Sequence, residues 1–317
     1  MNENKKRILT GCLCAVLCEI IFGFSFLFTK QITQSVSPVS LLGWRFLFAF
    51  VLINICVFSG ILHVDFSKLR GRAVLPVAAA SFFHPVLYFT GETFGIALTT
   101  ASESGVVIAS VPIVTITVAA VFLHETPTPA RIAGILVTLT GVLICVVSKG
   151  IEATFSPVGY AMLFMALLAY SFFCVFVRKA KNFSSTEITY VMLLFGTVFF
   201  AGASFAENAA AGTLKDFVML PLTSRSFLIA LIYLGAGCSV FAFILNNAAL
   251  ERIGPNGTVS FVGLTTLVTI VAGVILLHES FTWIQVAGTA LILGGVYLAN
   301  ASDIIKAGKP DGSGKER

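Results

Sequence analysis

The sequence predicts an all-α integral membrane protein whose ten transmembrane helices form two inverted five-helix repeats. Three observations carry this prediction. Hydrophobic residues make up 57% of the chain and charged residues 11%, whereas a soluble domain has about 25% charged residues. The apolar runs are about 20 residues long, which is the length that a helix needs to cross the hydrocarbon core of a bilayer. Finally, FLHETPT at 122–128 returns as LLHESFT at 276–282, so the two halves share a motif.

The expected spans follow from these apolar runs and from the turn signals between them. Proline after a polar residue or glycine is typical of the first turn of a helix, and it starts four spans: Ser37-Pro38, Thr128-Pro129, Ser156-Pro157 and Gly254-Pro255. Thr282 and Gln285 form a capping-box pattern before the last span. Pro85 and Pro112 lie within spans and predict kinks. In order, the spans are expected at 8–29, 38–58, 74–94, 99–123, 129–148, 157–177, 186–206, 227–249, 255–277 and 283–301.

The distribution of Lys and Arg among the loops predicts the orientation. With the N-terminus inside the cell, 15 of the 20 basic residues lie on cytoplasmic segments, as the positive-inside rule favours. We therefore expect a multi-pass protein of the inner (plasma) membrane with both termini in the cytoplasm and a disordered tail at 307–317. The diffuse net charge of +5 does not indicate nucleic-acid binding, and the seven cysteines lie inside apolar runs rather than at disulfide or zinc spacings. No cofactor or metal is expected.

The shared motif belongs to a longer internal repeat. Residues 121–148 laid over 275–302, an offset of 154, give ten identities in 28 positions, among them His124/His278, Glu125/Glu279, Gly134/Gly288 and Gly141/Gly295. A weaker match at an offset of 148 pairs Gly11 with Gly159. The expected domains are therefore two five-span repeats, at 1–150 and 151–306. Because five is odd, the second copy enters the membrane from the opposite side. This plan is typical of secondary transporters, whose substrate site lies between the halves near the midplane.

Several stretches carry a resemblance to a known family: FGFSFLFTK at 22–30, SPVSLLGWRF at 37–46, GIALTTASESGVVIASVPIV at 95–114 and the LHE that closes a span in each half. Together with the duplicated five-span halves, they resemble the drug/metabolite transporter superfamily, EamA type, over about residues 8–302. The resemblance implies a transporter of small organic metabolites, often an exporter. It also implies a central cavity lined by parts of spans 1, 3, 4, 6, 8 and 9.

Polar side chains present in only one half are the better candidates for function, because shared features most simply maintain the fold. Glu19 aligns with Leu167, Arg45 with Leu193, His84 with Cys238, Glu92 with Asn246 and Glu103 with Gly257. Ionisable groups inside spans are costly and mark functional sites by default. His84, Tyr88 and Glu92 are spaced to form one stripe along a helix. The expected substrate-binding residues are Glu19, Phe22, Arg45, His84, Tyr88, Glu92, Glu103, Tyr170, Asn246 and Asn247.

Each candidate also has a structural interpretation. Glu19 and Arg45 lie at similar depths, so they may equally be read as a structural ion pair beside a hydrated outer vestibule. His84 can be a satisfied core histidine, and the rings of Phe22 and Tyr170 can serve ordinary packing. Asn246 is a candidate for an inner gate. The repeated His-Glu pairs are read as turns and interfacial anchors in preference to a proton relay, because each glutamate directly precedes a helix.

The expected function is therefore that of a secondary transporter, not an enzyme. It would export small organic metabolites such as amino acids or related compounds by alternating access between the repeats, with proton coupling through a buried glutamate. The alternatives are broad drug efflux, a nucleotide-sugar-type exchanger, or a non-transporting sensor or scaffold. The sequence contains no HExxH and no Walker A motif. The expected partners are a small-molecule substrate and the lipid bilayer, with no nucleic acid, and the expected assembly is a monomer or a homodimer.

Overall fold

Helices account for the secondary structure of the part of the chain that the computed structural model describes, which is residues 3–69, 71–99, 104, 107–108, 110–124, 127–147, 156–277 and 283–308. No strand occurs within these ranges. The first half contains α1 (Glu3–Thr33), α2 (Pro38–Phe58), η1 (Gly71–Val74), α3 (Leu75–Ser81), η2 (Phe82–Leu87), α4 (Tyr88–Leu98), α6 (Val111–Leu123) and α7 (Pro129–Val147). The second contains α8 (Pro157–Lys179), α9 (Ser185–Ala210), α10 (Leu214–Thr223), α11 (Arg225–Ile232), η3 (Tyr233–Ala242), α12 (Phe243–Val259), α13 (Gly263–Leu277) and α14 (Trp283–Gly308).

The expected all-α membrane architecture is confirmed. Five helical segments are long and apolar enough to cross a membrane, and shorter apolar helices lie at 111–123, 129–141 and 286–299. The expected span 38–58 coincides with α2. Large apolar side chains on the outer faces of α2 and α8 are exposed, as expected of surfaces that face lipid (Val51, Ile55, Val158 and Phe164). The short helix α10 lies between two expected spans.

Several helices begin where the capping signals place them. The hydroxyl of Ser37 accepts a hydrogen bond from the backbone N–H of Ser40 at 3.1 Å, and the hydroxyl of Ser156 accepts one from Gly159 at 3.1 Å. Each bond satisfies an N–H that the helix itself leaves free, and the proline that follows each serine has no N–H to satisfy. The capping pattern of Thr282 falls outside the described residues.

The third and eighth expected spans are not regular helices. At η2 the backbone of His84 leaves the helical region (φ −140°, ψ 109°) ahead of Pro85, and the His84–Pro85 bond is cis. η3 is a π-helical segment that continues into α12, and α12 is interrupted at Gly254 (φ 72°) before Pro255. The kink predicted at Pro85 is therefore present. At Pro112 the helical residues 107–108 are followed by a turn at Ser110, and Pro112 stands in the first turn of the new helix α6, where a missing N–H costs nothing.

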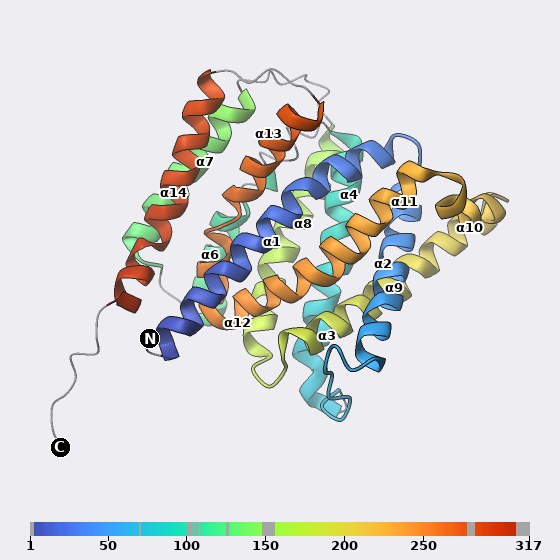
Figure 1. Ribbon diagram of the computed structural model, residues 1–317, viewed down its shortest axis with the longest axis horizontal. Helices are drawn as coiled ribbons and strands as arrows, with labels where there is room; N and C mark the ends of the chain where they lie inside the picture. Colours follow the sequence, from blue (N-terminus) through green and yellow to red (C-terminus); the bar gives the residue numbers. More distant parts are fainter. Residues whose placement is uncertain are drawn as a thin grey trace.

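The two halves exchange their first helices. α1 packs against α12 and α13 of the second half, and α8 packs against α4 and α6 of the first half. α2 packs against its counterpart α9, and α7 lies beside its counterpart α14, as Figure 1 shows. Exchanging the halves therefore carries these helix pairs into one another.

Close glycine contacts follow the same exchange. A Cβ atom on Gly11 would lie 2.7 Å from the side chain of Ile253, and one on Gly159 would lie 2.6 Å from the side chain of Thr99. Gly11 and Gly159 are partners at the offset of 148, and Thr99 and Ile253 are partners at the offset of 154. Between α7 and α14, the glycines allow the two backbones to touch, as small residues do at membrane helix interfaces.

Candidate functional site

A cavity lies between the helices of the two halves, where α1, η2, α4, α8 and the turn before α13 meet. About 40 Å³ of it is open to water, which is room for about three water molecules. Its lining combines two carboxyl groups with aromatic rings, hydroxyls and aliphatic side chains: Glu19, Phe22, Ser25, Phe26, His84, Tyr88, Phe89, Glu92, Ile108, Val111, Tyr170, Val262 and Thr265.

Most of the residues singled out from the sequence meet in this cavity. Glu19, Phe22, His84, Tyr88, Glu92 and Tyr170 all contribute to the lining. Arg45, Asn246 and Asn247 are buried behind it. Glu103 lies outside the residues that the structure describes.

Glu19 is buried on α1 and has a polar partner on α13. The hydroxyl of Thr265 donates a hydrogen bond to its carboxylate. One turn further along, the hydroxyl of Thr269 donates to the backbone carbonyl of Gly23 at 2.7 Å. Sequence reasoning missed Thr265, although the rule that found Glu19 also applies to it. Its counterpart at the offset of 154 is the apolar Val111.

Arg45 is not the partner of Glu19. Its Nε donates to the hydroxyl of Ser239 at 2.8 Å, and its guanidinium carbon lies 4.3 Å from the centre of the Phe89 ring, a cation–π contact. No ion pair joins Glu19 and Arg45, both of which belong to the described part of the chain, so the structural ion pair considered from the sequence is not formed. The arginine is therefore held behind the cavity lining by Phe89 and Ser239.

The predicted stripe along η2 and α4 faces the cavity. Tyr88 donates a hydrogen bond from its hydroxyl to Oε1 of Glu92 at 2.8 Å, one helical turn away. His84 sits among aromatic rings, with ring centres at 4.7 Å for Phe173 and 4.9 Å for Phe243. Its Nδ1 has no hydrogen-bond partner among the described atoms, so His84 is not a fully satisfied core histidine.

The two asparagines lie one layer behind the lining. The Tyr170 hydroxyl donates to Oδ1 of Asn246 at 3.1 Å, and this bond orients the tyrosine at the cavity. Asn247 points elsewhere, because its Nδ2 donates to the hydroxyl of Thr189 on α9 at 2.9 Å. Asn246 therefore reaches the cavity through Tyr170, whereas Asn247 ties α12 to α9.

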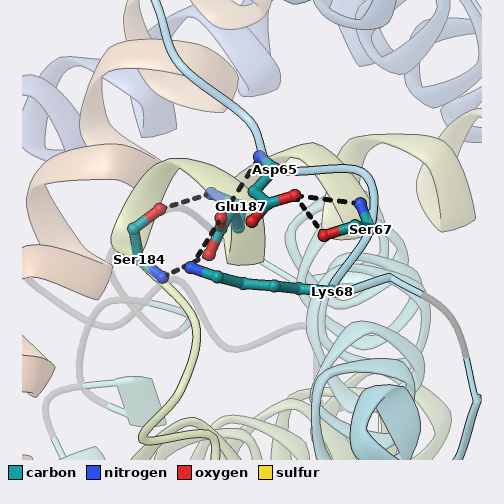
Figure 2. A network of polar contacts seen from close by, with 5 residues as sticks. All are labelled: Asp65, Ser67, Lys68, Ser184 and Glu187. Carbon is teal, nitrogen blue, oxygen red and sulfur yellow. Dashed lines mark hydrogen bonds and ion pairs between the residues drawn. The ribbon is translucent and has the colours of Figure 1, made fainter.

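A second polar cluster joins the halves at one end of the bundle, and sequence reasoning did not find it (Figure 2). Ser184 and Glu187 form a capping box at the start of α9, in which Oε2 of Glu187 accepts from the Ser184 backbone N–H at 2.7 Å. Oε1 of the same carboxylate accepts from the Asp65 backbone N–H at 3.2 Å and from Nζ of Lys68 at 3.3 Å. Ser67 donates two hydrogen bonds to the Asp65 carboxylate, from its backbone N–H and its hydroxyl, and these bonds lower the pKa of Asp65. These bonds connect the loop after α2 to the start of α9 in the other half.

The His-Glu motif is described in part. His124 ends α6 in the left-handed conformation (φ 54°), which is a common way for a helix to stop. Glu125, His278 and Glu279 fall outside the described residues. The part of the motif that the structure describes, His124, therefore forms the end of α6.

Comparisons with known proteins agree on one family. The model of the EamA-like transporter family matches residues 9–147 and 157–301. An uncharacterized transporter of Bacillus subtilis, YcxC, is 30% identical over 308 residues, which is 96% of this chain and 97% of that protein. An Escherichia coli protein named "Probable amino-acid metabolite efflux pump" is 21% identical over 291 residues, 90% of this chain and 92% of that protein. One crystal structure aligns with a TM-score of 0.70 at 18% identity over 94% of this chain and 97% of that one, which shows a shared fold.

Proposed function

Since the chain belongs to the EamA-like transporter family, we propose that it is a secondary transporter that exports small organic metabolites, such as amino acids or related compounds. The observation that carries the proposal is the cavity between the halves, with two buried carboxyl groups in its lining. Carboxyl groups are costly inside a membrane protein and are retained where a substrate or ion passes. A relative that shares 21% of its residues with this chain is named as an efflux pump for amino-acid metabolites, which supports the substrate class.

Alternating access between two inverted repeats is the mechanism that we propose. The exchange of α1 and α8 between the halves and the paired glycine contacts support a two-fold relation between them. The cavity holds only about three water molecules, so a metabolite enters when the lining helices move apart. The distribution of Lys and Arg supports cytoplasmic termini. In Figure 1 the loop after α2 and the start of α9 lie near the same end of the bundle as the start of α1, so the proposed orientation assigns this end, with the Glu187–Asp65 contact, to the cytoplasmic side.

Each lining residue has a proposed role. Glu19 and Glu92 hold the polar group of the substrate, and the rings of Phe22, Tyr88 and Tyr170 contact its apolar part. Asn246 supports an inner gate by orienting Tyr170. Arg45, which lies against Phe89 on the same helix as Glu92, supplies a buried positive charge behind the cavity wall.

Proton coupling through Glu19 is part of the proposal. Cys18 is its neighbour on α1, and the titratable groups that share the cavity with it are His84 on η2, Tyr88 and Glu92 on α4 and Tyr170 on α8. Cys238 on η3 is bonded to the Ile21 carbonyl of α1, and Arg45 on α2 lies behind the lining. The described side chains of α13 add the hydroxyl of Thr265 and no titratable group. Glu19 is thus a lining carboxyl group with a hydrogen bond to a helix of the second half, so a movement of that helix changes its environment.

The test is transport by purified protein in proteoliposomes under an imposed pH gradient, with a panel of metabolites of different charge. We expect movement of at least one compound to depend on the gradient. Glu19→Gln should remove this dependence, whereas Glu207→Gln, at an exposed carboxylate bonded to Ser37, should keep it. Full gradient dependence in Glu19→Gln would exclude Glu19 as the coupling group, and no movement of any compound would refute the transport function.

A further inference from the structure

We propose that the cavity recognises a primary ammonium group on an aromatic or branched apolar body, and that it disfavours a free carboxylate. This inference rests on the proposed transport function and names the substrate class of the same cavity. It would place amines and carboxyl-blocked amino acids ahead of free amino acids and organic acids.

Charge in the lining is the first argument. Glu19 and Glu92 are the two acidic lining residues, and the described lining holds no lysine or arginine. Arg45 does not line the cavity: its Nε donates to Ser239 and its guanidinium lies against the face of Phe89. The charge of Glu19 then remains for a ligand cation. An anionic ligand would face two carboxylates, and the described lining offers it no lysine or arginine to contact.

The hydrogen-bond donors are the second argument. Each hydroxyl of the described lining already donates to a protein acceptor: Ser25 to the Phe22 carbonyl, Tyr88 to Glu92, Tyr170 to Asn246 and Thr265 to Glu19. The carboxylates each accept one of these bonds and retain further acceptor positions. Apart from the imidazole of His84, whose Nδ1 has no partner among the described atoms, the lining is therefore rich in acceptors and poor in free donors. An ammonium group brings three donors and no acceptor, which complements it.

The rings are the third argument. Phe22, Phe26, Tyr88, Phe89 and Tyr170 bring five aromatic rings to the same lining. Aromatic faces attract a cation and also pack against an apolar body. Val111 at the start of α6, Ile108 just before that helix and Val262 in the turn before α13 add aliphatic surface. A ligand with a cationic end and an apolar end matches both parts of this lining.

Three compounds that share a phenyl ring on a two-carbon chain separate the charge classes: 2-phenylethylamine, phenylalanine and 3-phenylpropionate. Binding is measured on the purified full-length protein as the rise of its thermal unfolding midpoint with ligand concentration. We expect 2-phenylethylamine to bind about 10- to 100-fold more tightly than 3-phenylpropionate, because the ammonium gains charged hydrogen bonds that the carboxylate lacks. Phenylalaninamide, whose carboxyl group is blocked, should likewise bind more tightly than phenylalanine. Tryptamine against indole-3-propionate repeats the comparison with a larger body.

Glu19→Gln should remove the stabilisation by the amines, and Glu207→Gln should keep it. If Glu19→Gln does not fold, the ranking of the charge classes on the unmodified protein still decides the question. Equal or tighter binding of the carboxylates, or no stabilisation by either amine, would overturn the inference. Transport of a neutral or anionic metabolite by a protein that ignores the amines would also overturn it and leave the transport function standing. Amine binding without transport of any compound would instead refute the transport function alone.

Discussion

Replacing Gly295 by alanine tests the contact between α7 and α14. A Cβ atom on Gly295 would lie 2.3 Å from Oγ1 of Thr138, 2.5 Å from the Thr138 backbone nitrogen and 2.6 Å from the carbonyl oxygen of Gly134. Two of these three atoms belong to the backbone of α7, so no change of rotamer relieves the overlap. The helices must move apart.

The expected cost follows from this geometry. To reach an ordinary separation the helices would move by about 1 Å, and a gap of that size forfeits roughly a quarter to a half of the contact energy along the interface. Overpacking of this kind costs about 1–3 kcal/mol. Alanine in place of glycine also favours the helix by up to about 1 kcal/mol, which partly offsets the loss.

The neighbouring glycine provides the control. A Cβ atom on Gly294 would meet nothing within 4 Å, so Gly294→Ala gains the helix preference without the overlap. We expect the thermal unfolding midpoint of the detergent-purified protein to be unchanged or raised in Gly294→Ala and lowered by several degrees in Gly295→Ala. Gly134→Ala, which meets the backbone of Ala299 at 2.3 Å, should behave like Gly295→Ala. Equal midpoints for the alanine variants at 294 and 295 would refute the assignment of close backbone packing to this interface.

Three further variants test the polar contacts. Glu187→Ala removes the capping-box carboxylate and should cost about 1–2 kcal/mol of unfolding free energy. Lys68→Ala should cost under about 1 kcal/mol, because the lysine side chain is 45% exposed. Equal losses of stability in thermal unfolding would contradict this ranking. Thr265→Val keeps the side-chain volume but leaves the Glu19 carboxylate without its hydroxyl, so transport in proteoliposomes should fall about tenfold, and Thr269→Val should change it less. Tyr88→Phe deprives Glu92 of its donor and should also lower transport about tenfold, while Tyr190→Phe, bonded to Asn54 away from the cavity, should leave the rate unchanged.

The repeat predicted much of the cavity because it separates features that both halves need from features that one half adds. Glu19, His84 and Glu92 were found in this way, and all three line the cavity. Thr265 fits the same rule, but a threonine inside a span carries no charge and so drew no attention. Its importance comes from a partner that lies 246 residues earlier in the chain.

The Glu19–Arg45 pair shows where the sequence could not decide. Counting residues along a helix gives depth in the membrane, and both side chains were expected at similar depths. Whether they meet depends on how α1 and α2 are rotated about their axes, which tertiary packing sets. Ser239 lies in η3 and Phe89 in α4, so the partners of Arg45 come from elements distant in the chain. Pro85 marks the irregularity at η2 in the sequence, whereas the π-helical turns of η3 contain no proline and are a product of packing.

The exchange of α1 and α8 has a consequence for biosynthesis. α1 ends at Thr33 and its partner α12 begins at Phe243, so about 210 residues must be translated before the two can meet. At the usual rates of synthesis this takes roughly 10–40 s. During that time Glu19 is in the membrane without its hydrogen bond from Thr265, and α4 lacks its packing partner α8 until that helix is made. A ribosome that stalls between the halves would release a chain whose first helix lacks its two main neighbours, α12 and α13, and such a chain is a natural substrate for membrane quality control.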